Sequence, residues 1–307
     1  MKISVIIPVF NAALFLDKAI QSALNRPQVG EILLIDDRSE DDSYGICKEW
    51  TDKDHRIQLF RNEGMKGAGA TRNIGIRNAK FDFITFLDAD DYFLKRRFES
   101  NEMLFNKYPE VEAISMPVKI ILSDLKVEKL FQERFIHEQL FGMNQPETII
   151  NIWDNNISNE PKQINGITFR KSVFEKIGYF DEHLKQCQDT DLILRMLIHC
   201  RVMSGGDQNP VAVYFRHDNN TTRNLTEAVY FRRMAAKKHF RIAFQHKLPR
   251  IRKWRYFKQF VEYDYLWIFG KDILGKKLIK LLMLPIFLYR ILSTNQVIYN
   301  KDRRIDY

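Results

Sequence analysis

Short runs of apolar, β-favouring residues alternate with segments of helical period over the first 87 residues of the chain. Each run fits a strand that is buried on both faces. The predicted strands are residues 2–10, 31–35, 56–60 and 81–87. The predicted helices between them are residues 12–25, 41–51 and 68–79. This alternation predicts an α/β fold with a mostly parallel, doubly wound sheet and right-handed crossovers.

The pattern is less regular from residue 111 to residue 227. We interpret residues 111–227 as the second half of the domain that residues 1–110 begin. The elements predicted there are strands at 111–121 and 163–170 and a helix at 191–199.

Residues 228–307 hold much of the positive charge. The whole chain has a formal net charge of +9, and this segment holds 19 Lys and Arg against 5 Asp and Glu. It is helical by composition, with breaks predicted near Pro249, Gly270 and Pro285. A basic helical C-terminal extension on a mildly acidic globule indicates contact with an anionic surface, either lipid or nucleic acid. Residues 273–292 are amphipathic, which fits insertion into a membrane interface or a core helix with a solvated lysine face.

Composition excludes several classes of protein. A chain of 307 residues and 36.6 kDa is too large for a small disulfide-stapled scaffold. Its 45% hydrophobic and 28% charged residues exclude a disordered or collagen-like chain. No stretch reaches the roughly 18 uncharged apolar residues of a spanning helix. The cysteines, which show no pairing pattern, and the lack of a signal-peptide pattern predict a cytoplasmic protein.

The ends of the predicted strands carry the polar residues of greatest chemical interest. In doubly wound sheets, ligands bind beyond the carboxyl ends of the strands. This rule places four segments on one rim: residues 8–11, residues 36–39, the loop before Arg72, and residues 88–91.

Three acids in four residues follow the last of these strands. Asp88, Asp90 and Asp91 would repel one another unless a cation or a hydrogen-bond donor lies between them. Mg²⁺ and Mn²⁺ prefer carboxylate oxygens and often share their coordination with substrate phosphates. The alternative is a turn whose acids are solvated or cap the next helix.

A second acid pair and a glycine-rich loop lie on the same predicted rim. Asp37 could accept from the imide N–H of a uracil, whereas the alternative is an Asx turn before a helix that Ser39 and Asp42 would cap. Residues 64–73 could place backbone N–H groups and the Arg72 guanidinium near phosphates, or they could form a simple turn. The loop does not fit a Walker A or dinucleotide-binding pattern.

Two further candidates lie late in the chain. Asp189 and Asp191 begin an apolar helical segment, so each could be a general base or an N-cap. His217 could bind a metal or a phosphate, although a single His is more often structural.

Taken together, these motifs resemble the family 2 glycosyltransferases, which are inverting enzymes of the GT-A fold. The resemblance covers about residues 2–225 and rests on the order and spacing of five motifs. They are Ser4-Val-Ile-Ile-Pro-Val-Phe-Asn11, Ile35-Asp-Asp-Arg-Ser39, Arg72-Asn73, Phe86-Leu-Asp-Ala-Asp-Asp91 and Gly178-Tyr-Phe-Asp-Glu182 followed by Asp189-Thr-Asp191.

The resemblance implies transfer of a hexosyl or N-acetylhexosaminyl group from a UDP-sugar, with Mn²⁺ or Mg²⁺ as cofactor. Residues 1–110 would bind the nucleotide-sugar and residues 111–227 the acceptor, as in bacterial enzymes of cell-surface polysaccharide synthesis. The implied substrate-binding residues are Pro8, Phe10, Asn11, Asp37, Arg72, Asn73, Asp88, Asn165, Gly166 and Asp191. The implied metal ligands are Asp90, the last acid of the DXD motif, and His217; the implied catalytic base is Asp189.

Two residues depart from the family pattern. Arg38 stands where Gly is common, and Gln188 stands where Glu often precedes the base. The second departure leaves Asp191 as an alternative to Asp189.

The resulting prediction is a metal-dependent direct displacement on a glycan or lipid-linked acceptor, at the inner face of the plasma membrane, where the basic extension binds anionic lipid. One alternative is a sugar-phosphate nucleotidyltransferase, but that class is expected to have a Gly-rich, Arg-containing loop after the first strand, where residues 8–11 stand. The other is a non-catalytic nucleic-acid-binding protein that uses aromatic residues among the cations of the extension. We expect no nucleic-acid partner, because the acids on the rim would repel phosphate unless metal-bound.

Overall fold

The computed structural model describes residues 1–122, 148–150, 163–205, 209–217 and 225–269. The chain divides into two compact units, residues 1–223 and residues 224–307. The sequence-based division into 1–110, 111–227 and 228–307 stays a prediction.

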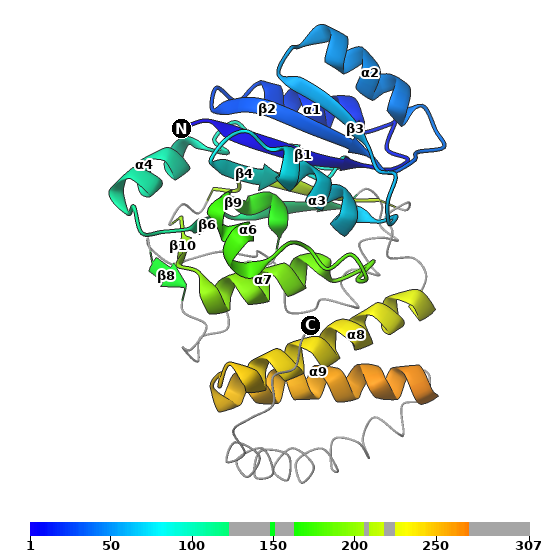
Figure 1. The fold of residues 1–307 in the computed structure, drawn as a ribbon, viewed down its shortest axis with the longest axis vertical. Coiled ribbons are helices and arrows are strands. Elements are labelled where there is room, and N and C mark those ends of the chain that lie inside the picture. Colours follow the sequence, from blue (N-terminus) through cyan, green and yellow to red (C-terminus); the bar gives the residue numbers. More distant parts are fainter. Residues whose placement is uncertain (123–147, 151–162, 206–208, 218–224, 270–307) are drawn as a thin grey trace. The chain divides into compact units, whose positions relative to one another are not determined.

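The first unit is built on a mostly parallel sheet flanked by helices, as predicted (Figure 1). Within the described residues the strand order is β3-β2-β1-β4-β9-β6-β10-β8. The strands are β1 (Ile3–Val9), β2 (Val29–Asp36), β3 (Ile57–Arg61), β4 (Phe83–Phe86), β6 (Ala113–Ser115), β8 (Thr148–Ile150), β9 (Ile167–Arg170) and β10 (Val202–Ser204). Strands β3, β2, β1 and β4 pair in parallel, and β9 pairs antiparallel to β4 and β6.

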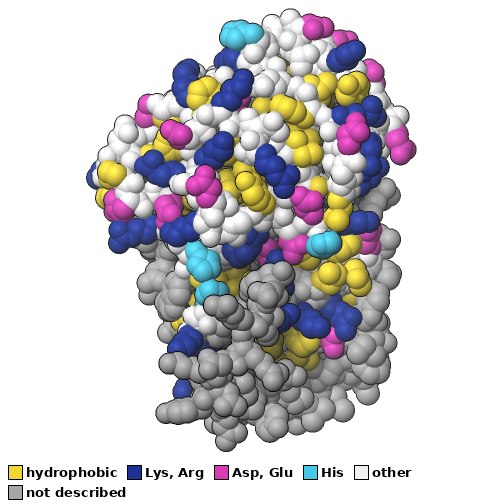
Figure 2. Space-filling view, in the orientation of Figure 1, with side chains coloured by type: hydrophobic (Ala, Val, Ile, Leu, Met, Phe, Trp, Pro, Cys, Tyr) yellow, Lys and Arg dark blue, Asp and Glu magenta, His cyan; other side chains and the backbone are white. Residues whose placement is uncertain are grey.

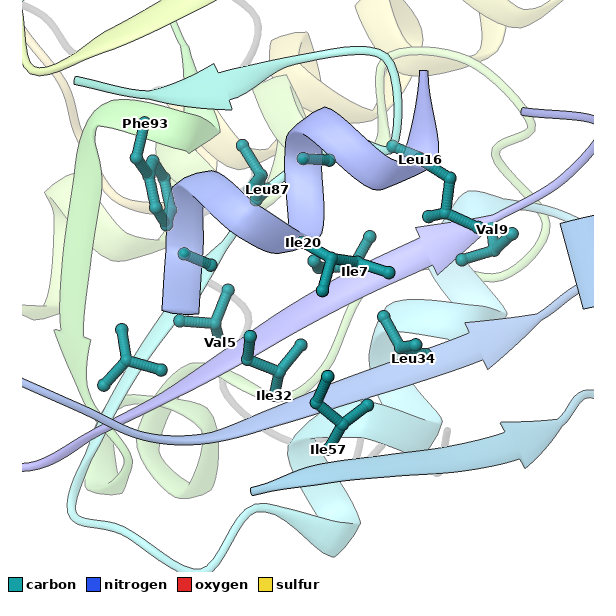
Figure 3. Close-up of a cluster of buried hydrophobic side chains, with 14 of the residues drawn as sticks. Val5, Ile7, Val9, Leu16, Ile20, Ile32, Leu34, Ile57, Leu87 and Phe93 are labelled. Carbon is teal, nitrogen blue, oxygen red and sulfur yellow. The ribbon is translucent and has the colours of Figure 1, made fainter. Parts of the chain in front are cut away.

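Alternate residues of β1 pack against opposite layers of helices. Val5, Ile7 and Val9 point toward Leu16 and Ile20 of α1 (Leu16–Leu24), in a cluster of buried hydrophobic side chains (Figure 3). The helix α2 (Ser43–Lys53) contributes the buried Cys47 to the same cluster. Burial on both faces explains why this strand is almost continuously apolar in the sequence.

The opposite face of the sheet is covered by α3 (Ala68–Asn78). A Cβ added to Gly75 would lie 2.4 Å from Ile6 Cγ2 and 3.1 Å from Ile35 Cδ1. The helix therefore approaches the sheet more closely than a larger residue would allow. This close approach brings the N-terminal turn of α3 to the rim where β1 and β2 end.

The predicted strand at 111–121 is two strands that belong to different sheets. β6 lies in the large sheet, whereas β7 (Val118–Leu122) joins β11 (Ala212–Arg216) and β5 (Tyr92–Phe93) in a sheet of order β5-β11-β7. The chain changes sheet at Pro117, which has no N–H for a ladder bond. The predicted strand at 163–170 likewise divides into a short 3-10 helix, Ile164–Gly166, and β9.

Three further helices complete the described first unit: α4 (Glu99–Lys107), α6 (Ser172–Ile177) and α7 (Gln188–His199). The helix predicted at 191–199 is α7, which begins three residues earlier. The predicted capping of α2 by Ser39 and Asp42 is wrong: the N-cap Asp42 makes no side-chain cap bond, and Ser39 Oγ accepts from the backbone N–H of Asn11. Lys and Arg are interspersed with Asp and Glu over the described surface in Figure 2.

The described part of the second unit, residues 225–269, forms the helices α8 (Leu225–Gln245) and α9 (Arg250–Phe269), with the predicted break at Pro249 between them. Phe257 of α9 packs against Phe240 and Phe244 of α8, and Arg233 pairs with Asp264 across the two helices. The predicted breaks at Gly270 and Pro285 and the amphipathic segment 273–292 lie outside the described residues. Among the helices that are described, none is both long enough and apolar enough to span a bilayer.

Candidate active site

The register of the parallel strands brings the predicted segments to one rim. Val9 pairs with Asp36, and the backbone N–H of Asp37 donates to the carbonyl of Val9 at 2.8 Å. Leu87 N donates to Ile6 O at 3.0 Å, so the acidic residues that follow β4 leave the sheet beside the end of β1.

Asp36 and Asp37 are adjacent, but their carboxylates bind different parts of the structure. Asp36 is fully buried and accepts from the backbone N–H groups of Arg38 and Ser39 at 3.1 and 3.2 Å, which is the predicted Asx turn. This turn places Arg38 in the left-handed region, with φ of 62°. The turn aims Asp37 away from the sheet, toward the glycine-rich loop.

The Asp37 carboxylate anchors that loop. It accepts from Asn62 Nδ2 at 2.7 Å and from the backbone N–H of Gly67 at 2.8 Å. Asn62 also donates to Met65 O at 2.7 Å and accepts from Gly64 N at 2.9 Å. Our sequence analysis missed Asn62, although it directly follows β3 and the strand-end rule applies to it as well.

An aromatic ring and a cation stand beside this loop. Pro8 is half-buried, whereas the Phe10 ring is 41% exposed and lies 4.3 Å from Lys66 Nζ. Asn11, with φ of 49°, accepts from Glu40 N at 2.8 Å and so fixes the turn after β1. An exposed ring flanked by a cation suits stacking of a planar base, and Lys66 had not been singled out from the sequence.

Arg72 and Asn73 point in different directions from α3. Arg72 is 4% exposed and its NH2 donates to Asp88 Oδ1 at 2.5 Å, while its Nε and NH1 find no partner among the described residues. Asn73 donates to Phe180 O and Glu182 Oε1 at 3.0 and 2.8 Å and accepts from Phe180 N at 2.9 Å. Arg72 therefore has donors that no described residue uses, whereas Asn73 ties α3 to the segment before α7.

Asp90 lies against His217, and the assignment of the two as metal ligands stays a prediction. The Asp90 Oδ2 to His217 Nε2 distance is 3.1 Å, and both side chains are largely buried. Burial raises the pKa of the Asp90 carboxyl, and the charge of Asp88 raises it further, although the hydrogen bond with His217 lowers it. A bound cation would relieve this electrostatic cost.

Asp91 is the internal anchor of the acidic turn. It is 1% exposed, accepts from Phe215 N at 2.7 Å and accepts a short hydrogen bond from Asn165 Nδ2. Burial raises the pKa of Asp91 well above its usual range, and the charges of Asp90 and Asp88 add to this. Because Phe215 lies near the end of β11 and His217 directly follows that strand, this anchor also sets where His217 meets Asp90.

A buried arginine, Arg97, holds Asn165, the residue that donates to Asp91. Arg97 is fully buried; its Nε donates to Asn165 O at 3.1 Å and its NH2 donates to Thr85 Oγ1 at 2.8 Å. Burial lowers the pKa of Arg97 to about 9. Asn165 and Gly166, predicted to contact the acceptor, are both buried, and a Cβ on Gly166 would lie 2.4 Å from Met116 O. In this structure they serve packing and the Asp91 anchor.

The two candidate bases differ in their surroundings. Asp191 is fully buried and its Oδ2 accepts from Arg195 Nε and NH2 at 3.0 and 2.9 Å. Asp189 is half-buried, and within the described structure its carboxylate accepts only from Thr190. The N-cap of α7 is Cys187, so neither acid caps the helix. This contrast favours Asp189 as the group that could take a proton from a substrate.

Solved structures share this fold. The structure of Staphylococcus aureus TarS 1-349 in complex with UDP-GlcNAc superposes with a TM-score of 0.64 at 16% identity, over 86% of this chain and 73% of that chain. This likeness and the sheet topology confirm the predicted GT-A fold, a mostly parallel sheet between layers of helices.

The sequence itself places the chain in a family. Residues 4–157 match the sequence profile of Glycosyl transferase family 2. The chain therefore belongs to the family 2 glycosyltransferases, as its motifs predicted.

Curated relatives share this identity over part of their length. An uncharacterized glycosyltransferase of Haemophilus influenzae is 38% identical over 138 residues, which is 42% of this chain and 55% of the relative. A β-1,3-glucosyltransferase of Campylobacter jejuni, named for GalNAc(5)-diNAcBac-PP-undecaprenol, is 40% identical over 95 residues, 30% of this chain and 31% of the relative. The match with the first of these relatives thus spans about half of that relative's length.

Proposed function

We propose that this chain transfers a hexosyl or N-acetylhexosaminyl group from a UDP-sugar to a hydroxyl of a glycan or lipid-linked acceptor, with inversion. The observation that carries this proposal is the acidic turn 88–91, which leaves the sheet at the rim shared with Asp37 and contacts both Arg72 and His217. The TarS structures with UDP and UDP-GlcNAc support a nucleotide-sugar donor for this fold.

The UDP-sugar would lie along the rim, with each of its parts next to a different residue. Phe10 and Pro8 would flank the base, and Asp37 would accept from the uracil N–H. Asp88 would contact the ribose, and the unpartnered donors of Arg72 would face the phosphates. Asn11 would act indirectly, by holding the turn that carries Phe10.

The acidic turn fits Mn²⁺ or Mg²⁺ as a partial donor set. Asp90 and His217 already face each other at 3.1 Å, and burial together with the nearby charge of Asp88 raises the pKa of Asp90, so a cation bound there would stabilise its ionised form. The described residues hold no group of three or more His, Cys, Asp or Glu that could hold a metal, so donor phosphates would complete the coordination. A divalent ion would neutralise charge on the leaving diphosphate.

Asp189 is the proposed base. It would remove the proton of the acceptor hydroxyl while that oxygen bonds to the anomeric carbon and the bond to UDP breaks on the opposite face. Asp191 is a positioning residue in this scheme, because Arg195 holds its carboxylate and also donates to Tyr179 O at 2.9 Å.

The test compares Asp189→Asn with Asp52→Asn, which changes an exposed aspartate of α2. UDP affinity is measured by calorimetry with Mn²⁺, and transfer is measured as UDP release from a panel of UDP-sugars. We expect Asp189→Asn to bind UDP normally and to lose transfer by a factor of at least about 100, the usual contribution of general-base catalysis. Transfer near the wild-type rate in Asp189→Asn would contradict the assignment, and release of pyrophosphate instead of UDP would indicate a nucleotidyltransferase.

We also propose peripheral binding to the anionic inner face of the plasma membrane through the basic extension. The excess of 19 cations over 5 acids in residues 228–307 supports it, as does the C. jejuni relative whose name includes an undecaprenol-linked glycan. Each Lys near an anionic surface contributes about 1 kcal/mol. Reversing the charges of Lys276, Lys277 and Lys280 in the full chain is therefore expected to weaken binding to phosphatidylserine vesicles by about 100-fold or more.

The matched control reverses three exposed lysines of the first unit, Lys2, Lys48 and Lys53. It removes the same net charge and should leave vesicle binding within a few-fold of the wild type. Equal losses in both triple variants would show that net charge, not the extension, attracts the chain to the surface.

A further inference from the structure

Gln188 opens α7 with a side-chain amide that has no partner. The residue is 9% exposed, and its Oε1 makes no hydrogen bond with any residue that the structure describes. Buried amides are almost always paired, because water is no longer available to them. An unpaired acceptor next to the proposed base Asp189 therefore points to a ligand that supplies the missing donor.

Gln188 lies beside the first turn of α3, which carries Arg72. A Cβ added to Gly69 would lie 3.8 Å from the Gln188 Cβ, so the start of α7 packs against the first turn of α3. Phe180 joins the two helices: its Cβ is 3.5 Å from the same point, and its ring lies 5.5 Å from the Arg72 guanidinium carbon.

Gln188 and Arg72, which both lie near Phe180, offer opposite hydrogen-bonding groups. Arg72 has unpartnered N–H donors in Nε and NH1, which suit phosphate oxygens. A carbonyl oxygen such as Gln188 Oε1 repels phosphate and accepts from a hydroxyl or an amide N–H. In the proposed donor site Asp37 would serve the nucleoside, Arg72 the diphosphate and Asp189 the attacking hydroxyl, which leaves Gln188, next to Asp189, for the sugar.

We propose that Gln188 is a specificity-determining residue that accepts a hydrogen bond from a hydroxyl or N-acetyl N–H of the sugar being transferred. This inference rests on the proposed function, because it assigns the sugar subsite of the same donor. A glutamine amide also carries two donors, so it can bind the oxygen of the same hydroxyl through either of its polar atoms.

The test separates binding of the sugar from binding of UDP. Dissociation constants are measured by calorimetry with Mn²⁺ for UDP, UDP-glucose, UDP-galactose, UDP-GlcNAc and UDP-GalNAc. The ratio of the UDP constant to that of the tightest UDP-sugar gives the contribution of the sugar. In Gln188→Met, which keeps the side-chain length, we expect this ratio to fall about 3- to 10-fold, the effect of one neutral hydrogen bond, with UDP affinity within about 2-fold of the wild type.

Two other variants make the result decisive. Gln188→Glu keeps an acceptor atom and should keep the wild-type ratio within about 3-fold, even if its charge weakens UDP itself. Gln21→Met changes an exposed glutamine of α1 and should alter no dissociation constant. If Gln188→Met does not fold, retention of the ratio in Gln188→Glu still supports an acceptor at this position.

The outcomes also distinguish this inference from the proposed function. A wild-type chain that binds neither UDP nor any UDP-sugar would overturn the proposed function, and the inference with it. Normal UDP binding with an unchanged ratio in Gln188→Met, or with equal losses for UDP and UDP-sugar, would overturn only the role of Gln188. The same holds if the wild type binds every UDP-sugar no more tightly than UDP.

Discussion

Asn165→Ala tests whether Asn165 anchors the acidic turn or contacts the acceptor. The substitution removes the amide that donates to Asp91 and leaves the backbone carbonyl that Arg97 contacts. Asn165 Oδ1 has no partner among the described residues, so its loss breaks no second hydrogen bond. The perturbation is therefore confined to one bond between an amide and a buried carboxylate.

The magnitude follows from the charge of the acceptor, so unfolding is measured at a pH above the raised pKa of Asp91, where its carboxylate is ionised. A hydrogen bond to a charged group contributes about 1.5–3 kcal/mol to the free energy of unfolding, against about 0.5–1.5 kcal/mol for a neutral pair. Asn101 offers a matched control, since it is fully buried, also has an unpartnered Oδ1 and donates to a hydroxyl, Thr168 Oγ1, at 2.6 Å. The two alanine variants should thus differ by about 1–2 kcal/mol, with Asn165→Ala the less stable.

Thermal unfolding followed by circular dichroism measures this difference. At about 2–4 °C per kcal/mol for a unit of this size, Asn165→Ala should melt roughly 2–8 °C below Asn101→Ala. The reasoning is refuted if the two variants melt together. An unchanged melting temperature with a raised KM for the acceptor would instead restore the sequence-based prediction that Asn165 contacts the acceptor.

Three further substitutions test other parts of the structure. Gly75→Ala should destabilise the chain by about 1–3 kcal/mol in thermal unfolding because its Cβ would overlap Ile6, whereas Gly45→Ala, whose Cβ meets only the flexible Asp42 side chain, should be neutral or stabilising. Asp191→Asn should lower the melting temperature, since breaking a buried ion pair costs about 3–5 kcal/mol, and should leave calorimetric UDP affinity unchanged. Asp90→Ala should abolish the enhancement of UDP binding by Mn²⁺ in the same titration, and an undiminished enhancement would exclude Asp90 as a ligand.

The regular elements of the first 87 residues could be predicted because one physical signal dominated there. Continuous apolar runs and helical periods alternate in that part, and the observed elements differ from the predicted ranges mainly at their ends. The prediction failed at 111–121, where one apolar run serves two sheets. Pro117 marked that division in the sequence, but a proline is compatible with an edge strand as well as with a change of sheet.

The site was harder to predict because a side chain's type reveals its chemical capacity and not its partner. Asn73 and Asn165 were both expected to bind substrate, yet the side-chain amide of each donates a hydrogen bond within the protein. The partners of Asn73 lie 107 and 109 residues away along the chain, and the partner of Asn165 lies 74 residues away. Such pairings depend on the folded topology, which local spacing does not encode.

Asp88, Asp90 and Asp91 each contact a different part of the structure. Asp91 faces inward, where Phe215 and Asn165 bind its carboxylate and hold the turn between two sheets. Asp88 pairs with Arg72, whereas the carboxylate of Asp90 meets His217, which directly follows β11. If Asp91 lost its anchors, β11 and the turn could shift independently, and the 3.1 Å approach of Asp90 to His217 would no longer be imposed by the fold. The buried Asp91 thus fixes the geometry in which Asp88 and Asp90 lie close together, and in that geometry burial and the charge of Asp88 raise the pKa of Asp90.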